Sequence, residues 1–115
     1  MTIYLAKTLD NMKKYGDIYD LSMEPDDRVE KYVFGSEENE WLVNNVIDGI
    51  NAECDTLLDD GDYDYISCEK CNSLIKLLNN INLDVIPLKC KELIVKILEY
   101  SNLAIEYKTG IAIEL

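Results

Sequence analysis

The chain of 115 residues contains no histidine. Histidine is the commonest general base, the usual partner of a nucleophilic serine or cysteine, and the commonest metal ligand in proteins. Its absence removes the catalytic triads that depend on it. We therefore expect a protein that is not an enzyme and that uses no cofactor.

Long apolar runs and linker-like segments are also missing. No run approaches the roughly 20 residues that a transmembrane helix needs, and the stretch from Met1 to Leu9 lacks the cleavage site of a signal peptide. With only five glycines, two prolines and 48% hydrophobic residues, the composition predicts one globular domain spanning residues 1–115. We expect a cytoplasmic protein that makes no membrane contact.

Positive charge is scarce and unevenly distributed. The chain has 11 Lys and Arg against 23 Asp and Glu, a net charge of −12. Seventeen of the carboxylates lie between Asp10 and Asp64 with only four basic residues, whereas residues 65–115 carry six acids and six bases. A concentrated negative field attracts basic surfaces and repels phosphate backbones. A basic protein partner is therefore expected, without direct binding to nucleic acid.

Apolar residues at helical spacing predict three helices, over residues 36–59, 67–81 and 87–108. The first begins at Ser36, an N-cap candidate followed by two glutamates, and its buried face is expected to include Leu57. The third begins near Pro87 and ends before Gly110, a residue type that often follows a helix C-terminus.

Short strands are predicted near residues 3–6, 32–34 and 111–115, and residues 62–66 form a turn or a strand. Residues 104–107 and 112–115 nearly repeat each other and could instead form a hairpin, although helical spacing beyond Ser101 favours the helix. In either case the last strand can pair with the first. The predicted fold class is α+β and mainly helical, with about three helices and a small sheet formed by the N- and C-terminal strands.

A stripe of acids and amides without positive charge follows the polar side of the first predicted helix. Its members are Glu37, Glu40, Asn44, Asp48, Asn51, Asp55 and Asp59. Trp41 falls at its edge, where an indole among carboxylates suits an arginine-rich partner. A solvated face explains the stripe equally well, and Trp41 could simply pack under the N-terminal segment.

Aspartates and tyrosines alternate from Asp59 to Tyr65. Starting at Asp60, the segment matches three positions of an EF-hand loop, but Tyr65 stands where glycine is needed and Cys71 where a bidentate glutamate is needed. An inhibitor surface uses this composition, and so does an ordinary turn. The candidate partner-binding residues are therefore Glu37, Glu40, Trp41, Asp48, Asp55, Asp59, Asp60, Asp62, Tyr63, Asp64 and Tyr65.

Four cysteines could supply zinc ligands, namely Cys54, Cys68, Cys71 and Cys90. Three of them, all except Cys68, fall on predicted apolar helix faces, where a free cysteine behaves as a small hydrophobic residue. We expect core packing and no metal site.

Three junctions complete the layout of the chain. The segment Tyr32-Val33-Phe34-Gly35 leads into Ser36-Glu37-Glu38, the segment Tyr65-Ile66-Ser67 leads into the second predicted helix, and Gly110-Ile111-Ala112-Ile113 lies at the end. In this layout, and in its acidity and lack of histidine, the chain resembles small acidic bacterial immunity proteins, most closely those of contact-dependent growth inhibition systems.

The resemblance implies binding, in the cytoplasm, to the basic C-terminal catalytic domain of a toxin, in many cases a nuclease, and occlusion of its active-site cleft. Immunity proteins share no binding motif, so the resemblance assigns no site residues. The alternative is an acidic nucleic-acid mimic that inhibits a DNA-binding host or defence protein.

Overall fold

The computed structural model describes all 115 residues. Its elements, in chain order, are β1 (Thr2–Ala6), β2 (Lys14–Tyr15), β3 (Ile18–Tyr19), β4 (Val29–Val33), α1 (Ser36–Asn45), α2 (Ile47–Cys54), β5 (Tyr63–Ser67), α3 (Cys68–Asn79), the short 3₁₀ helix η1 (Leu83–Val85), α4 (Leu88–Tyr107) and β6 (Gly110–Glu114). The predicted α+β class is confirmed, with four α-helices rather than three.

The main sheet is antiparallel and has the strand order β4-β1-β6-β5, while β2 and β3 form a separate hairpin. The first and last strands are central neighbours, with Thr2 opposite Glu114, as the sequence predicts. Side chains alternate between the two faces of β1. Ile3 and Leu5 join the main core, and Tyr4 and Ala6 join a second cluster on the opposite face.

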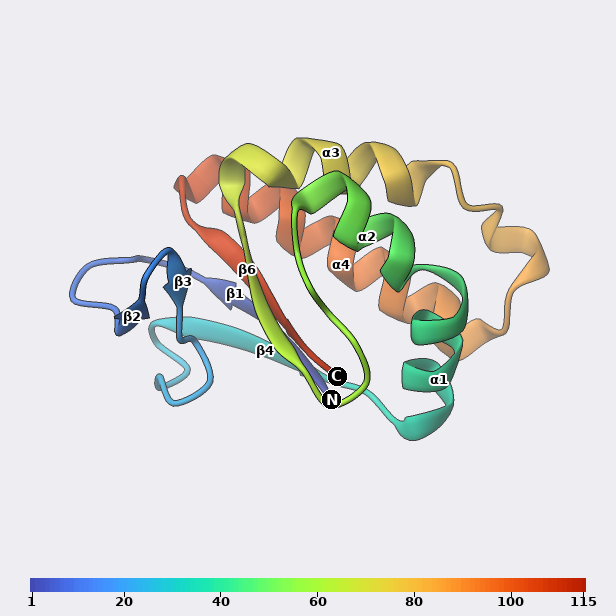
Figure 1. The fold of residues 1–115 in the computed structure, drawn as a ribbon, viewed down its shortest axis with the longest axis horizontal. Helices are drawn as coiled ribbons and strands as arrows, with labels where there is room; N and C mark the ends of the chain where they lie inside the picture. The colour runs from blue at the N-terminus through green and yellow to red at the C-terminus, as the bar shows by residue number, and fades with distance from the viewer.

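Helices α3 and α4 cover one face of the sheet, with α2 beside them and α1 at one end (Figure 1). Residues 7–28, which include the β2–β3 hairpin, cover the other face and contribute Met12 and Leu21 to the second cluster. Because both faces are covered, β1 and β6 are mostly buried and read as nearly continuous apolar runs.

The predicted single helix over residues 36–59 is wrong. The helix breaks at Val46, where φ is −128°, and α2 then ends at Cys54 because Asp55 adopts the left-handed conformation. The break turns α2 so that Ile47 and Ile50 are buried in the core. Gly49 faces α3 so closely that a Cβ atom there would lie 3.2 Å from Leu77 Cδ1. The residues after Asp55 therefore form an irregular loop.

At the C-terminal end, the favoured helical interpretation is confirmed because α4 continues to Tyr107. The left-handed residue that ends it is Lys108, and Gly110 instead begins β6. Glycine is needed there because a Cβ atom on Gly110 would overlap the hydroxyl oxygen of Tyr65. None of the helices combines the length and apolar character that crossing a membrane requires.

Candidate partner-binding surface

The loop between α2 and β5 is held in place by one side chain of α2. Asn51 Oδ1 accepts hydrogen bonds from Thr56 Oγ1 at 2.7 Å and from the Leu58 N–H at 2.8 Å, and Asn51 Nδ2 donates to the Leu58 carbonyl at 2.8 Å. Further along, the Asp62 carbonyl accepts a hydrogen bond from the Leu115 N–H at 2.8 Å. Both ends of the acidic segment are thus fixed to regular structure.

A second amide joins this loop to α1. The helix begins after Gly35, whose N–H donates to Glu38 Oε2 at 2.9 Å, a bond that lowers the pKa of Glu38. One residue further on, Asn39 Nδ2 donates to Asp60 Oδ1 at 2.9 Å. Acidic residues of α1 and of the loop, separated by about 20 positions in the chain, therefore belong to one surface.

We call this the acidic surface and define it by the exposed residues Glu37, Glu40, Asp59, Asp60 and Asp62. Few basic residues of the chain pair with these carboxylates. Lys89 Nζ lies 4.0 Å from Glu37 Oε2, and no Lys or Arg forms an ion pair with the other four carboxylates. The surface therefore presents negative charge that the chain itself leaves largely uncompensated.

A groove of about 380 Å³ lies within the acidic surface, between α1 and the loop. It is lined by Ser36, Asn39, Glu40, Val43, Asn44 and Asp60. Asn39 is only 8% exposed, and its Oδ1 atom has no hydrogen-bond partner. Buried polar atoms are nearly always paired, so this one marks a place where a donor is missing.

The remaining acids predicted for the site lie elsewhere. Asp55 Oδ2 accepts a hydrogen bond from Lys70 Nζ at 2.7 Å, and this exposed ion pair lowers the pKa of Asp55. Asp64 lies in β5, where its carboxylate accepts hydrogen bonds from the N–H groups of Leu57 and Tyr65. Asp48 is exposed on α2, beyond the break at Val46.

The expectation of exposed contact area is wrong for Tyr65, and Tyr63 is only partly exposed. Tyr65 is buried in the second cluster, with its ring centroid 5.2 Å from that of Tyr19. The Tyr63 hydroxyl donates to the Tyr19 carbonyl at 2.6 Å and accepts from the Leu21 N–H at 2.9 Å. Desolvation raises the pKa of both phenols. These tyrosines attach residues 7–28 to the sheet.

Trp41 is the other predicted aromatic contact. It is partly buried and packs against the main core. It is not among the residues that line the groove.

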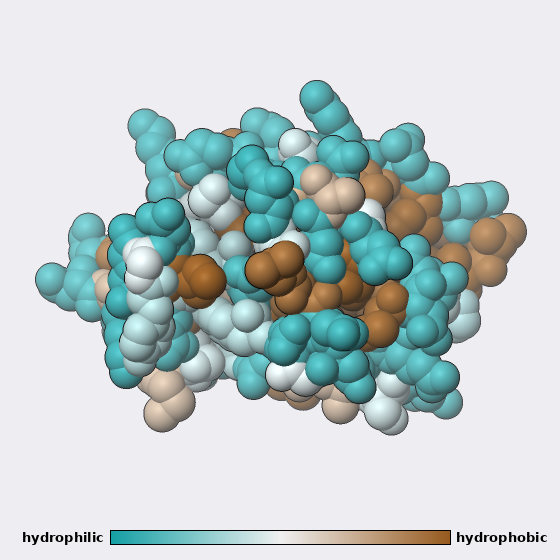
Figure 2. All heavy atoms as spheres, in the orientation of Figure 1, coloured by the Kyte–Doolittle hydropathy of each residue, from teal (hydrophilic) through white to brown (hydrophobic).

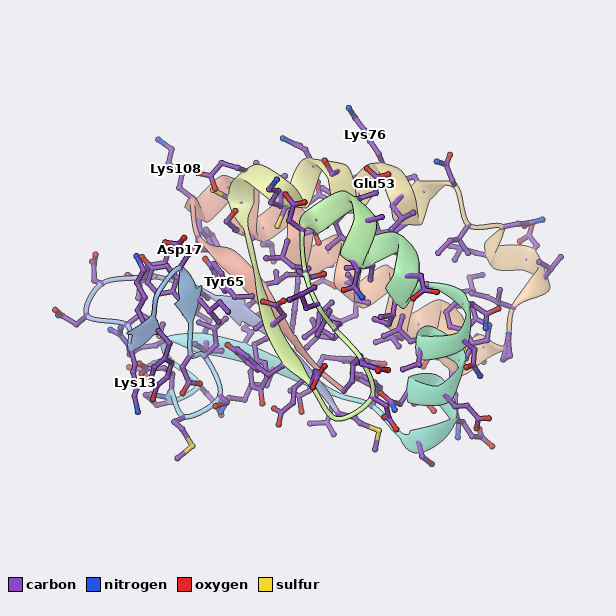
Figure 3. The ribbon with its side chains drawn as sticks, viewed as in Figure 1. Lys13, Asp17, Glu53, Tyr65, Lys76 and Lys108 are labelled. Atoms are coloured by element: carbon purple, nitrogen blue, oxygen red, sulfur yellow. The ribbon has the colours of Figure 1, made fainter.

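The sequence does not predict an exposed apolar side chain in the loop between α2 and β5. Leu57, predicted to be buried, is 87% exposed, and it lines a hollow of about 400 Å³ together with Ile18 of the hairpin. Asp17 and Tyr65 line the same hollow and lie on the same side of the molecule (Figure 3). Hydrophobic atoms are exposed in the middle of this face and are bordered by hydrophilic ones (Figure 2).

The cysteines and the partial EF-hand pattern are the remaining candidates for a metal site. Cys54, Cys71 and Cys90 are buried, and desolvation raises the pKa of Cys54 to about 11 and that of Cys71 to about 12. The expected core packing of these thiols is confirmed. No group of three or more Cys, Asp or Glu side chains is arranged to hold a metal ion. The partial EF-hand pattern does not form such a loop because Asp64 belongs to a strand.

No protein-family model, curated protein or solved structure matches this chain. Its function must therefore be argued from the surface itself.

Proposed function

We propose that this chain is an immunity protein that binds a cognate bacterial toxin domain in the cytoplasm and neutralises it. The partner is a basic C-terminal domain with nuclease activity, and the acidic surface covers its active-site cleft. The observation that carries the proposal is the joining of two separate acidic segments into one surface by the hydrogen bond from Asn39 to Asp60.

The charge of this surface suits a cleft that binds nucleic acid. Glu40, Asp59, Asp60 and Asp62 are exposed and have no ion-pair partner in the chain. Lysine and arginine in a nuclease cleft are arranged to meet phosphates, and carboxylates on a protein inhibitor can meet them instead. Complementary charge also accelerates encounter, by about 10- to 1,000-fold.

The rigidity of the loop also supports a role in binding a partner. Association is opposed by the entropy of ordering loops and side chains, so a loop that is fixed before binding loses less free energy. The three hydrogen bonds of Asn51 and the bond from Leu115 to Asp62 fix this loop in the free protein.

Leu57 supplies a candidate apolar contact. Its side chain is exposed in the loop and lines the hollow together with Ile18 of the hairpin and Asp64 of β5. Interfaces commonly combine an apolar centre with a polar rim. We propose that Leu57 takes the central role that the sequence suggested for Trp41.

Capture of the partner tests the proposal. The tagged protein is incubated with cytosol of its native cell at low and high salt, and retained proteins are identified by mass spectrometry. A variant with Asp59→Lys and Asp62→Lys reverses two loop charges at positions that do not line the groove. The matched control, Glu53→Lys with Glu106→Lys, makes the same charge change at two exposed positions outside the groove; Figure 3 shows Glu53 on α2.

The proposal predicts one predominant basic domain, retained by the parent and the control variant and lost with the loop variant. When produced alone, this domain should stop growth, and co-production of the parent protein should restore it. Several DNA-binding proteins released together by salt would support the nucleic-acid mimic instead. A capture without a basic domain would contradict both functions.

A further inference from the structure

We infer that the groove between α1 and the loop binds one basic side chain of the partner, with its cationic head against Asn39, Glu40 and Asp60. The inference rests on the proposed function for the identity of the partner, and it adds the chemistry of one subsite.

The unpaired atom of Asn39 defines what is missing. Asn39 Nδ2 is already bonded to Asp60 Oδ1 at 2.9 Å, whereas Oδ1 is buried without a partner. Exchanging the amide oxygen and nitrogen would place the oxygen against a carboxylate, so the bond to Asp60 fixes the orientation. The atom that faces no partner is therefore an acceptor, and it requires a donor.

The other polar groups of the groove require the same kind of ligand. Glu40 and Asp60 are carboxylates, which accept hydrogen bonds and carry negative charge. No Lys or Arg of this chain forms an ion pair with either of them. A ligand that offers several N–H donors and a positive charge matches the chemistry of all three groups.

The walls and the size of the groove fit a side chain better than a metal ion. Val43 offers an apolar wall for a methylene stem, and the volume of about 380 Å³ exceeds what a single ion fills. The chain has no cluster of three or more acidic or thiol side chains arranged for a metal. Lysine and arginine combine an apolar stem with a cationic head.

The experiment uses a small arginine probe and needs no partner. N-acetyl-L-arginine amide is titrated into the ¹⁵N-labelled protein, and amide signals are followed by NMR. N-acetyl-L-citrulline amide, which has the same shape without the charge, is the matched neutral probe. Arginine amide should shift the Asn39 side-chain signal and the backbone signals of Glu40 and Asp60 in a saturable manner, and citrulline amide should leave them in place.

Variants test the assignment of the groups. Asn39→Leu and Glu40→Gln should each lower the affinity for the arginine probe by about ten-fold. This is the effect expected when a hydrogen bond to a charged group is lost. Glu106→Gln makes the same charge change as Glu40→Gln on exposed α4 surface outside the groove, and affinity should stay unchanged. Glu40 is exposed, so Glu40→Gln remains a test even where Asn39→Leu prevents folding.

Equal shifts with citrulline amide would overturn the inference. Shifts that spread evenly to distant acids such as Asp17 and Asp26 would overturn it as well. If arginine amide does not bind but the capture retains a basic domain, only the proposed subsite is contradicted. Arginine binding together with an empty capture supports the subsite and contradicts the immunity proposal.

Discussion

The side-chain amide of Asn51 bonds both backbone polar groups of Leu58, each at a distance of 2.8 Å. The two residues are seven positions apart, and the chain between them includes the left-handed residue Asp55. This pairing ends α2 and returns the chain towards β5. It places the acidic segment against α1 rather than along a continuous helix.

Removal of this amide should loosen the loop. Asn51→Ala deletes three hydrogen bonds, two of which satisfy Leu58 backbone groups, and is expected to lower the free energy of unfolding by about 2 to 4 kcal/mol. Asn72→Ala, at an exposed position of α3, serves as the control and should stay within about 0.5 kcal/mol of the parent. Urea unfolding measures both values. Equal midpoints for the two variants would show that the amide does not support the loop.

Trp41 should behave as a packing residue. Trp41→Ala removes a partly buried ring from the main core and is expected to cost about 2 kcal/mol, less than for a fully buried aromatic residue. Tyr107→Ala, at the exposed end of α4, should change stability by at most about 0.5 kcal/mol. Thermal melting compares the two. A Trp41→Ala protein as stable as the parent, with weaker partner binding, would instead establish Trp41 as an interface residue.

Two glycines should respond differently to alanine. Gly110→Ala places a Cβ atom against the Tyr65 ring and 2.6 Å from the Ile66 carbonyl oxygen, so a loss of about 3 kcal/mol is expected. Gly49→Ala meets only the flexible end of Leu77 and gains helix propensity, so the net change should stay within about 1 kcal/mol. Denaturation curves of both variants check this contrast. A stable Gly110→Ala protein would contradict the close approach of β6 to β5.

Alkaline pH should destabilise the fold through its buried tyrosines. Desolvation, followed for Tyr4 by its hydrogen bond to Glu114, raises the pKa of Tyr4 and of Tyr100 from 10.0 to about 12. The folded state then holds these protons more tightly than the unfolded state does. Their stabilising contribution is complete below the unfolded pKa of 10.0 and is lost as the pH rises from there through about 12.

Urea midpoints measured from about pH 9, below the unfolded pKa, up to the folded pKa of about 12 test this expectation. Tyr100→Phe should make the urea midpoint fall less steeply with pH, since it removes one of the phenols whose pKa is raised. Absorbance of the phenolate band should rise at higher pH for the folded chain than for the chain in concentrated urea. Coincident titrations in the two states would contradict the burial of these rings.

Local patterns predict the parts of this fold that depend on neighbouring residues. The apolar spacing of α4 continues without interruption to Tyr107, and the first and last strands are strongly apolar because both of their faces are covered. These signals predict the long helix and the central strand pair. They do not predict the cover of the second face, because residues 7–28 hold only short strands and irregular backbone.

Contacts between distant residues decide what the sequence misses. Helical spacing continues through Val46 to Leu57, so it cannot reveal that α2 turns to pack Gly49 against Leu77. The burial of Tyr63 depends on Tyr19 and Leu21, more than 40 residues away. The charge pattern of the sequence identifies candidate acids, whereas the bond from Asn39 to Asp60 shows that acids of α1 and of the loop share a surface.

We expect that the acidic surface, and not the net charge alone, recruits the partner domain. Stopped-flow association of the captured domain tests it with the parent protein, the Asp59→Lys/Asp62→Lys variant and the Glu53→Lys/Glu106→Lys control. At low salt the loop variant should associate at least about ten-fold more slowly than the control, and the two rates should converge at high salt. Equal slowing of both variants would contradict the account, because it would assign the attraction to net charge.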